Sequence, residues 1–219
     1  HVVQEGVFFQ TEYSKDDLSA FVSGSLSNTS YWRYDRLYYD KQHAESKTKS
    51  YLGFTVKGGA NYNVNDHHNV FFNVGYISRA PKFTYGAFLS PVASNVTNPD
   101  AKNEKVLSFE VGYGYRLKWL HVDVNGYWTK WLDKTMTKSS TLGTSQTEAF
   151  VNMTGVNALH KGVELEVKAS PFYWLDVNGM FSLGDWKWDS NAVGYVYDNN
   201  GQPLTKDGTI ASGIGAEDH

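Results

Sequence analysis

The side chains best placed for acid–base chemistry lie on one strand-like segment. Glu164 and Glu166, with Lys168, alternate with apolar residues, so all three share one face of a strand. Two carboxylates on one face could act as general acid and base. The same alternation predicts a solvated polar face, where such charges are ordinary, and the chain has no Gly-x-Ser-x-Gly, His-Glu-x-x-His or P-loop motif. We therefore predict that it is not an enzyme.

Metal and nucleic-acid sites find no support. His67 and His68 lie in a short turn without a third ligand nearby in the sequence, and His121 stands alone, whereas zinc takes three or four protein ligands. The chain has no cysteine, which excludes thiolate sites and disulfides, and its net charge of -3 contains no basic run. We predict no metal, no cofactor and no nucleic-acid partner.

Two polar stretches combine aromatic and cationic side chains, a combination that suits an anionic or ring-bearing ligand. They span Asp35 to Ser50 and Ala80 to Glu104. An equally good interpretation makes these residues interfacial, in contact with lipopolysaccharide. The candidate ligand-binding residues are Arg36, Tyr38, Tyr39, His43, Arg79, Lys82 and Tyr85.

The elements that must hold these loops follow a period of two over long runs. From Leu107 to Leu117, large apolar residues at odd positions alternate with small or polar ones, which predicts a β-strand with unlike faces. Most such segments reach the roughly 9–11 residues of a tilted transmembrane strand. We predict eight strands, at Val2–Tyr13, Leu18–Tyr34, Tyr51–Asn63, Asn69–Ile77, Lys105–Leu117, Leu120–Thr129, Lys161–Ala169 and Trp174–Trp188.

Connections between these segments alternate strictly between short and long. Short joins are expected at Ser14–Asp17, Val64–His68, Lys118–Trp119 and Ser170–Phe172, and long loops at Asp35–Ser50, Ala80–Glu104, Ser139–His160 and after Asp189. Outer-membrane barrels have short periplasmic turns and long extracellular loops. Aromatic residues make up 16% of the chain although its mean hydropathy is -0.47, and this pairing suits aromatic girdles around a wet lumen.

An even number of strands that alternate in direction places both ends of the chain at the same end of the sheet. His1 and His219 are expected at the long-loop end, outside the cell, whereas complete barrels of this class begin and end on the periplasmic side. The chain starts without a methionine or a signal sequence. We therefore expect a fragment, residues 1–219 being part of a barrel domain, rather than an independent eight-stranded barrel.

Several motifs then resemble those of TonB-dependent receptors. Ser78-Arg79-Ala80-Pro81 is followed by Asn98 to Lys105, which reads Asn-Pro-Asp-Ala-Lys-Asn-Glu-Lys, and then by a strand containing Glu110-Val111-Gly112. Asn125 to Lys130 and Lys161 to Glu166 are similar to the next strands of that family. Ala101 and Asn103 depart from its Leu and Pro. The resemblance covers roughly Tyr51 to Trp188. The amino-acid sequence around Trp174 resembles that of family members from Bacteroides-type bacteria.

This resemblance implies an all-β fold, an antiparallel up-and-down transmembrane barrel of about 22 strands, of which this chain supplies about eight. It implies a receptor in the outer membrane of a Gram-negative bacterium that takes up a scarce nutrient. The implied partners are membrane lipid, lipopolysaccharide, the imported ligand and the TonB complex, which is reached through a plug outside this chain. The plug and the closing strands are expected to lie elsewhere in the protein.

The ligand stays open. Ferric siderophores, haem, cobalamin, glycans and peptides are all carried by this family, and an iron chelate is our default expectation. Two other classes are weighed against transport: an outer-membrane enzyme built on a barrel, and a soluble carbohydrate-binding β-sandwich. A sandwich would have shorter strands and mixed loop lengths.

Overall fold

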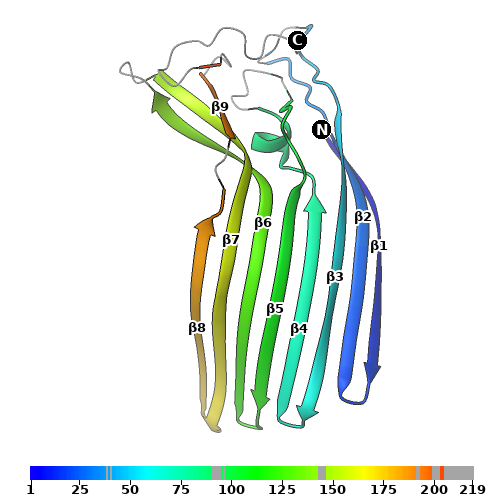
Figure 1. Cartoon of the computed structure of the whole chain (residues 1–219), viewed down its shortest axis with the longest axis vertical. Helices are drawn as coiled ribbons and strands as arrows, with labels where there is room; N and C mark the ends of the chain where they lie inside the picture. The colour runs from blue at the N-terminus through cyan, green and yellow to red at the C-terminus, as the bar shows by residue number, and fades with distance from the viewer. Residues whose placement is uncertain are drawn as a thin grey trace.

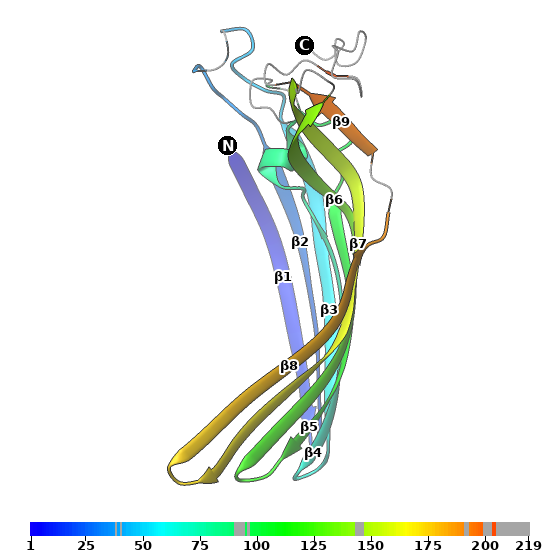
Figure 2. The same ribbon diagram turned by 90° about the vertical axis from the view of Figure 1, so that its left-hand side faces the viewer.

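The computed structural model describes residues 1–37, 39, 41–89, 95, 97–142, 147–190, 193–198 and 203–204. They form one curved antiparallel sheet in which each of the first eight strands pairs with its neighbour in the chain (Figures 1 and 2). The strands are β1 (Val2–Lys15), β2 (Leu18–Tyr31), β3 (Lys49–Asn65), β4 (His68–Arg79), β5 (Glu104–Arg116), β6 (Leu120–Leu142), β7 (Thr147–Phe172), β8 (Leu175–Trp188) and β9 (Val193–Tyr197). The expected up-and-down order of eight strands is confirmed.

The connection expected as a loop from Ser139 to His160 is different. β6 continues to Leu142 and β7 starts at Thr147, and the two stay paired over most of this stretch. Threonine and other β-formers favour the extended backbone there. The register shifts between Trp131 and Met136, and the hairpin beyond this irregularity bends away and receives β9 on β7 (Figure 2).

The short joins lie where the sequence predicts them, with one shift. Asn65 closes the β3–β4 turn, because its side-chain oxygen accepts the backbone N–H groups of His67 (2.9 Å) and His68 (3.1 Å). The β7–β8 turn falls on Tyr173 and Trp174 rather than on Ser170–Phe172. The register slips between Ala169 and Phe172, where Pro171 cannot donate a backbone hydrogen bond.

The two faces of the sheet differ as the alternation predicts. One outward row runs across the strands through Phe72, Val111, Val163 and Leu183, and these four apolar side chains are 46–67% exposed. The inward face is polar: Glu110 accepts hydrogen bonds from Asn73 (3.0 Å) and Asn125 (2.6 Å). A single sheet with an exposed apolar face lacks the second layer of a β-sandwich.

Inward aromatic rings lie over glycines of the neighbouring strands. The Phe71 ring occupies the space that a side chain on Gly112 would need, and Tyr127 does the same at Gly162. A side chain at either glycine would therefore collide with the neighbouring ring.

No helix in the described ranges is long and apolar enough to cross a membrane. His1 lies at the long-loop end of the sheet (Figure 1), where its amino group donates to the Trp32 carbonyl at 2.7 Å. His219 lies outside the described residues.

Candidate functional site at the loop end of the sheet

The long connections meet at one end of the sheet around a small aromatic core. Tyr31 and Phe88 are buried there with Ala87, and Phe83 packs against both aromatic rings, at centroid distances of 5.4 Å from Tyr31 and 5.0 Å from Phe88. The Tyr31 hydroxyl donates to the Pro81 carbonyl at 3.0 Å. These contacts hold the start of the 80–103 connection, including the short kinked segment Phe83–Ala87, against the upper end of β2.

Arg33 joins the two connections that carry the predicted ligand-binding residues. Its guanidinium carbon lies 4.5 Å from the centre of the Phe88 ring and 5.9 Å from that of Tyr39. Its Nε donates to Asn95 Oδ1 at 2.8 Å, and Asn95 Nδ2 donates to the His43 carbonyl at 3.0 Å. Burial lowers the pKa of Arg33 and raises that of Tyr39. Arg33 thus stabilises the loops, a role that the sequence did not reveal.

Arg79 is a predicted ligand contact that already has a partner. It donates from Nε (3.2 Å) and a terminal nitrogen (2.8 Å) to one oxygen of Glu104, which is 1% exposed. Its guanidinium also lies 5.3 Å from the Trp131 ring, on which Lys134 Nζ lies at 4.2 Å. Because charge-assisted pairs of this kind are strong, Arg79 fastens the base of the 80–103 connection.

The other predicted residues are spread over the surface of the loop end. Arg36, His43, Lys82 and Tyr85 are exposed, Arg36 lies over the Tyr34 ring at 5.4 Å, and Tyr85 has a φ of 67°. Tyr38 lies outside the described residues. Two members of the predicted set, Tyr39 and His43, are joined through Arg33 and Asn95: Arg33 contacts the Tyr39 ring, and Asn95 bonds both Arg33 and the His43 carbonyl.

A cavity of about 250 Å³ with both polar and apolar lining opens at the same end, beside the projecting β6–β7 hairpin. None of its lining residues is among the predicted ligand contacts: they are Asp100, Lys102, Asp133, Thr135, Thr154, Gly155 and Tyr195. A hydrogen bond from the Tyr195 hydroxyl to Asp100 raises the pKa of that tyrosine. Carboxylates, an ammonium group and hydroxyls in one cavity can bind a ligand rich in hydroxyl or amide groups. The feature of the sequence that points to this cavity is the high density of Asp, Asn and Lys in residues 98–105.

The acidic pair on β7 has an ordinary environment. Glu166 is paired with Lys168 at 2.6 Å, and both side chains are about half exposed. Within the described ranges, no three His, Cys, Asp or Glu side chains come close enough together to hold a metal ion.

Comparisons with known proteins agree with this architecture. The family model described as "TonB dependent receptor-like, beta-barrel" matches residues 2–215. Among solved structures, the chain is similar to the copper transporter OprC, with a TM-score of 0.66 and 15% sequence identity, covering 93% of this chain and 30% of that one. At this identity the likeness shows the fold alone. A search of curated proteins gave no match.

Proposed function

Because the chain belongs to the TonB-dependent receptor-like β-barrel family, we propose that residues 1–219 form part of the wall of a larger barrel in the outer membrane of a Gram-negative bacterium. The whole protein would be a receptor that imports a scarce nutrient, with energy delivered by the TonB complex through a plug outside this chain. The observation that carries this proposal is the single curved sheet, with apolar side chains outward and hydrogen-bonded polar side chains inward.

The proposed ligand is an anionic iron chelate, such as a ferric siderophore, or haem. Arg36, Lys82 and Tyr85 support this proposal because they are exposed at the loop end. Cations with neighbouring aromatic rings suit such ligands. Tyr38, Tyr39, His43 and Arg79 complete the proposed contact set, with Arg79 acting mainly through its contact with Glu104.

A glycan or peptide is the alternative ligand, and a specific feature favours it. The cavity lined by Asp100, Lys102 and Tyr195 carries charges of both signs and a hydroxyl group, which suits hydroxyl and amide groups better than an anionic chelate. The sequence around Trp174 supports a Bacteroides-type source, and sequences flanking the gene would test that origin.

Growth of a deletion strain separates these ligands. Cells carrying the full-length gene would be grown with one limiting nutrient at a time: ferric siderophore, haem, oligosaccharide or peptide. For an iron chelate, Arg36→Glu with Lys82→Glu would reduce uptake at least about tenfold, while Asp100→Asn would leave it unchanged. For a glycan, Asp100→Asn would reduce uptake, and the double substitution of Arg36 and Lys82 would leave it unchanged.

The reference variant is Lys15→Glu, which changes a charge at the opposite end of the sheet and is expected to have no effect. Uptake that persists without the TonB complex, or a full-length product found outside the outer membrane, would refute the proposed function.

A further inference from the structure

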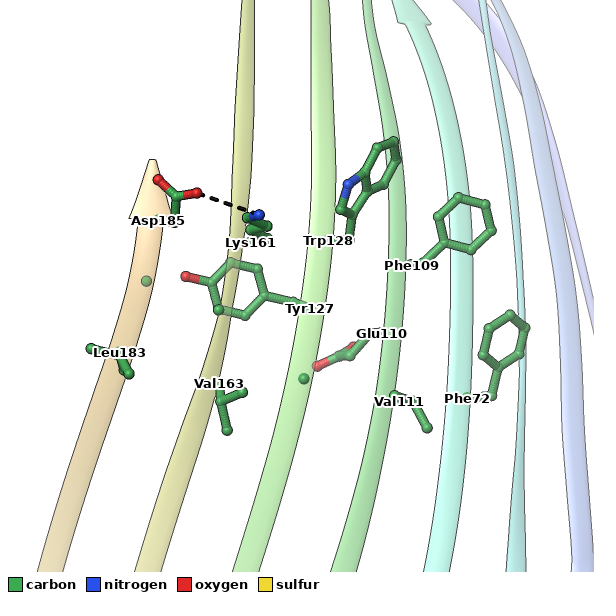
Figure 3. Close-up of a pocket in the computed structure, with 13 residues that line it drawn as sticks. Phe72, Phe109, Glu110, Val111, Tyr127, Trp128, Lys161, Val163, Leu183 and Asp185 are labelled. Atoms are coloured by element: carbon green, nitrogen blue, oxygen red, sulfur yellow. Dashed lines mark ion pairs between the residues drawn. The ribbon is translucent and has the colours of Figure 1, made fainter. Parts of the chain in front are cut away.

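The outward face of the sheet is hollowed over β6 (Figure 3). The hollow measures about 740 Å³ and extends from β4 to β8. Its floor is Gly126, where an added Cβ would meet no atom closer than 3.9 Å. Phe109 and Trp128, with ring centres 5.8 Å apart, bound it on one side, and Val163 and Leu183 bound it on another (Figure 3). The hollow therefore exists because a glycine replaces a large residue in an apolar face.

The floor of the hollow lies inside the sheet. Gly126 pairs with Val111 on β5 and with Val163 on β7, so that two paired strands lie on each side of β6. On its β8 side the hollow is lined by Leu183, Gly184 and Asp185, which belong to the strand at the open edge of the sheet.

Charged side chains lie along the side of the hollow nearer the loops. Lys161 and Asp185 line its rim as an ion pair with a nitrogen–oxygen distance of 3.4 Å (Figure 3). In the next row Lys130 pairs with Asp189 at 3.2 Å. Leu159 pairs with Lys130 on one side and with Lys187 on the other, so Lys187 lies in the same row. Lys187 has no carboxylate partner among the described residues. Three lysines thus accompany two aspartates, which leaves a surplus positive charge.

We propose that the hollow binds one acyl chain of a phosphate-bearing lipid in the leaflet on the long-loop side. The chain would lie over Gly126 between the Phe109–Trp128 rings and Val163. The phosphate would lie at Lys187, whose charge is not neutralised within the sheet. This order of groups, apolar hollow below and lysines above, matches a lipid with its head group towards the loops. The inference rests on the proposed function, because only a membrane-embedded sheet meets such a lipid.

Native mass spectrometry of the full-length receptor in detergent tests this site. Diphosphoryl lipid A would be titrated into the wild type, Gly126→Leu and Lys187→Glu. The leucine fills the hollow and is expected to weaken retention of one lipid at least about tenfold, because several methylene groups lose their contacts. Lys187→Glu should weaken it similarly, whereas Lys187→Arg should restore wild-type retention.

The matched control is Gly58→Leu on β3. Gly58 pairs with Val74 on the outward face of the sheet and lies outside the hollow. This variant should therefore retain lipid as the wild type does. Equal retention by the wild type and Gly126→Leu, equal binding of dephosphorylated lipid A, or a receptor dimer in place of the lipid adduct would overturn the inference. If cells carrying Gly126→Leu still take up nutrient while retention is unchanged, only this inference fails. A full-length product outside the outer membrane would instead refute the proposed function.

Discussion

Glu104, at the first position of β5, has a carboxylate that is almost fully buried against Arg79. In Glu104→Gln the hydrogen-bond geometry can persist, but the charge on the acceptor is lost. We expect the base of the 80–103 connection to be destabilised by about 1–3 kcal/mol. Trypsin cleavage after the exposed Lys82 in the full-length receptor should therefore become at least several-fold faster.

Glu5→Gln on β1 is the control for this measurement. Glu5 is exposed and has no side-chain partner among the described residues, so its substitution should leave the cleavage rate unchanged. Equal cleavage of Glu104→Gln and the wild type would show that the ion pair does not hold the loop.

Residue roles at the loop end could be predicted only in part. Its place beside a loop predicts Arg79 as a ligand contact, but its fixed partner Glu104 lies 25 positions away. Arg33 was missed because its contacts with Phe88 and Asn95 join separate connections. Such contacts follow no local period, so a single sequence contains no pattern that announces them.

At the scale of elements, Asp133 marks the point where the β6–β7 hairpin bends. Its φ of 57° is left-handed, its N–H donates to Asn157 Oδ1 at 3.1 Å, and its carboxylate pairs with Lys105 at 2.9 Å. Asp133→Val places a β-branched residue in this conformation, which costs about 1–2 kcal/mol. Amide hydrogen exchange across Met136–Met153 should become roughly tenfold faster.

Asp133→Asn separates backbone strain from the ion pair. Asparagine tolerates the left-handed region, and the lost pair with Lys105 is partly exposed, worth at most about 1 kcal/mol. The asparagine variant should therefore exchange close to the wild-type rate. Similar exchange in the valine and asparagine variants would mean that the conformation of residue 133 does not control the hairpin.

The strands themselves were predictable wherever the two faces meet different surroundings. In β5, alternation identified nearly the whole of Glu104–Arg116, and the order of the motifs from Ser78 to Glu166 predicted the family that residues 2–215 match. Beyond Trp131 the alternation fades in β6 and β7, because few of those side chains face a uniformly apolar surrounding. The sequence therefore predicted a loop where the structure has a paired hairpin and β9.

At the scale of the whole molecule, the exposed apolar face requires a partner. Its large hydrophobic residues cover most strands, and the buried cluster at the loop end is small by comparison. Exposed apolar surface of this extent is not stable in water, and the sheet has open edges at β1 and β8. These features support the proposal that the sheet is part of a larger barrel whose outward face meets lipid.

Two neighbouring residues of β8 test this assignment of faces. Phe181 lies in the outward row of Leu165 and is 63% exposed, whereas Ser182 pairs with the inward Glu164. In the full-length receptor refolded into lipid vesicles, Phe181→Lys should lower the free energy of unfolding in urea by about 2–4 kcal/mol, because a charge then enters hydrocarbon. Ser182→Lys should change it by less than about 1 kcal/mol, since the ammonium group faces the polar interior beside a carboxylate. A larger loss for Ser182→Lys would reverse the faces, and equal small effects would mean that neither residue faces lipid.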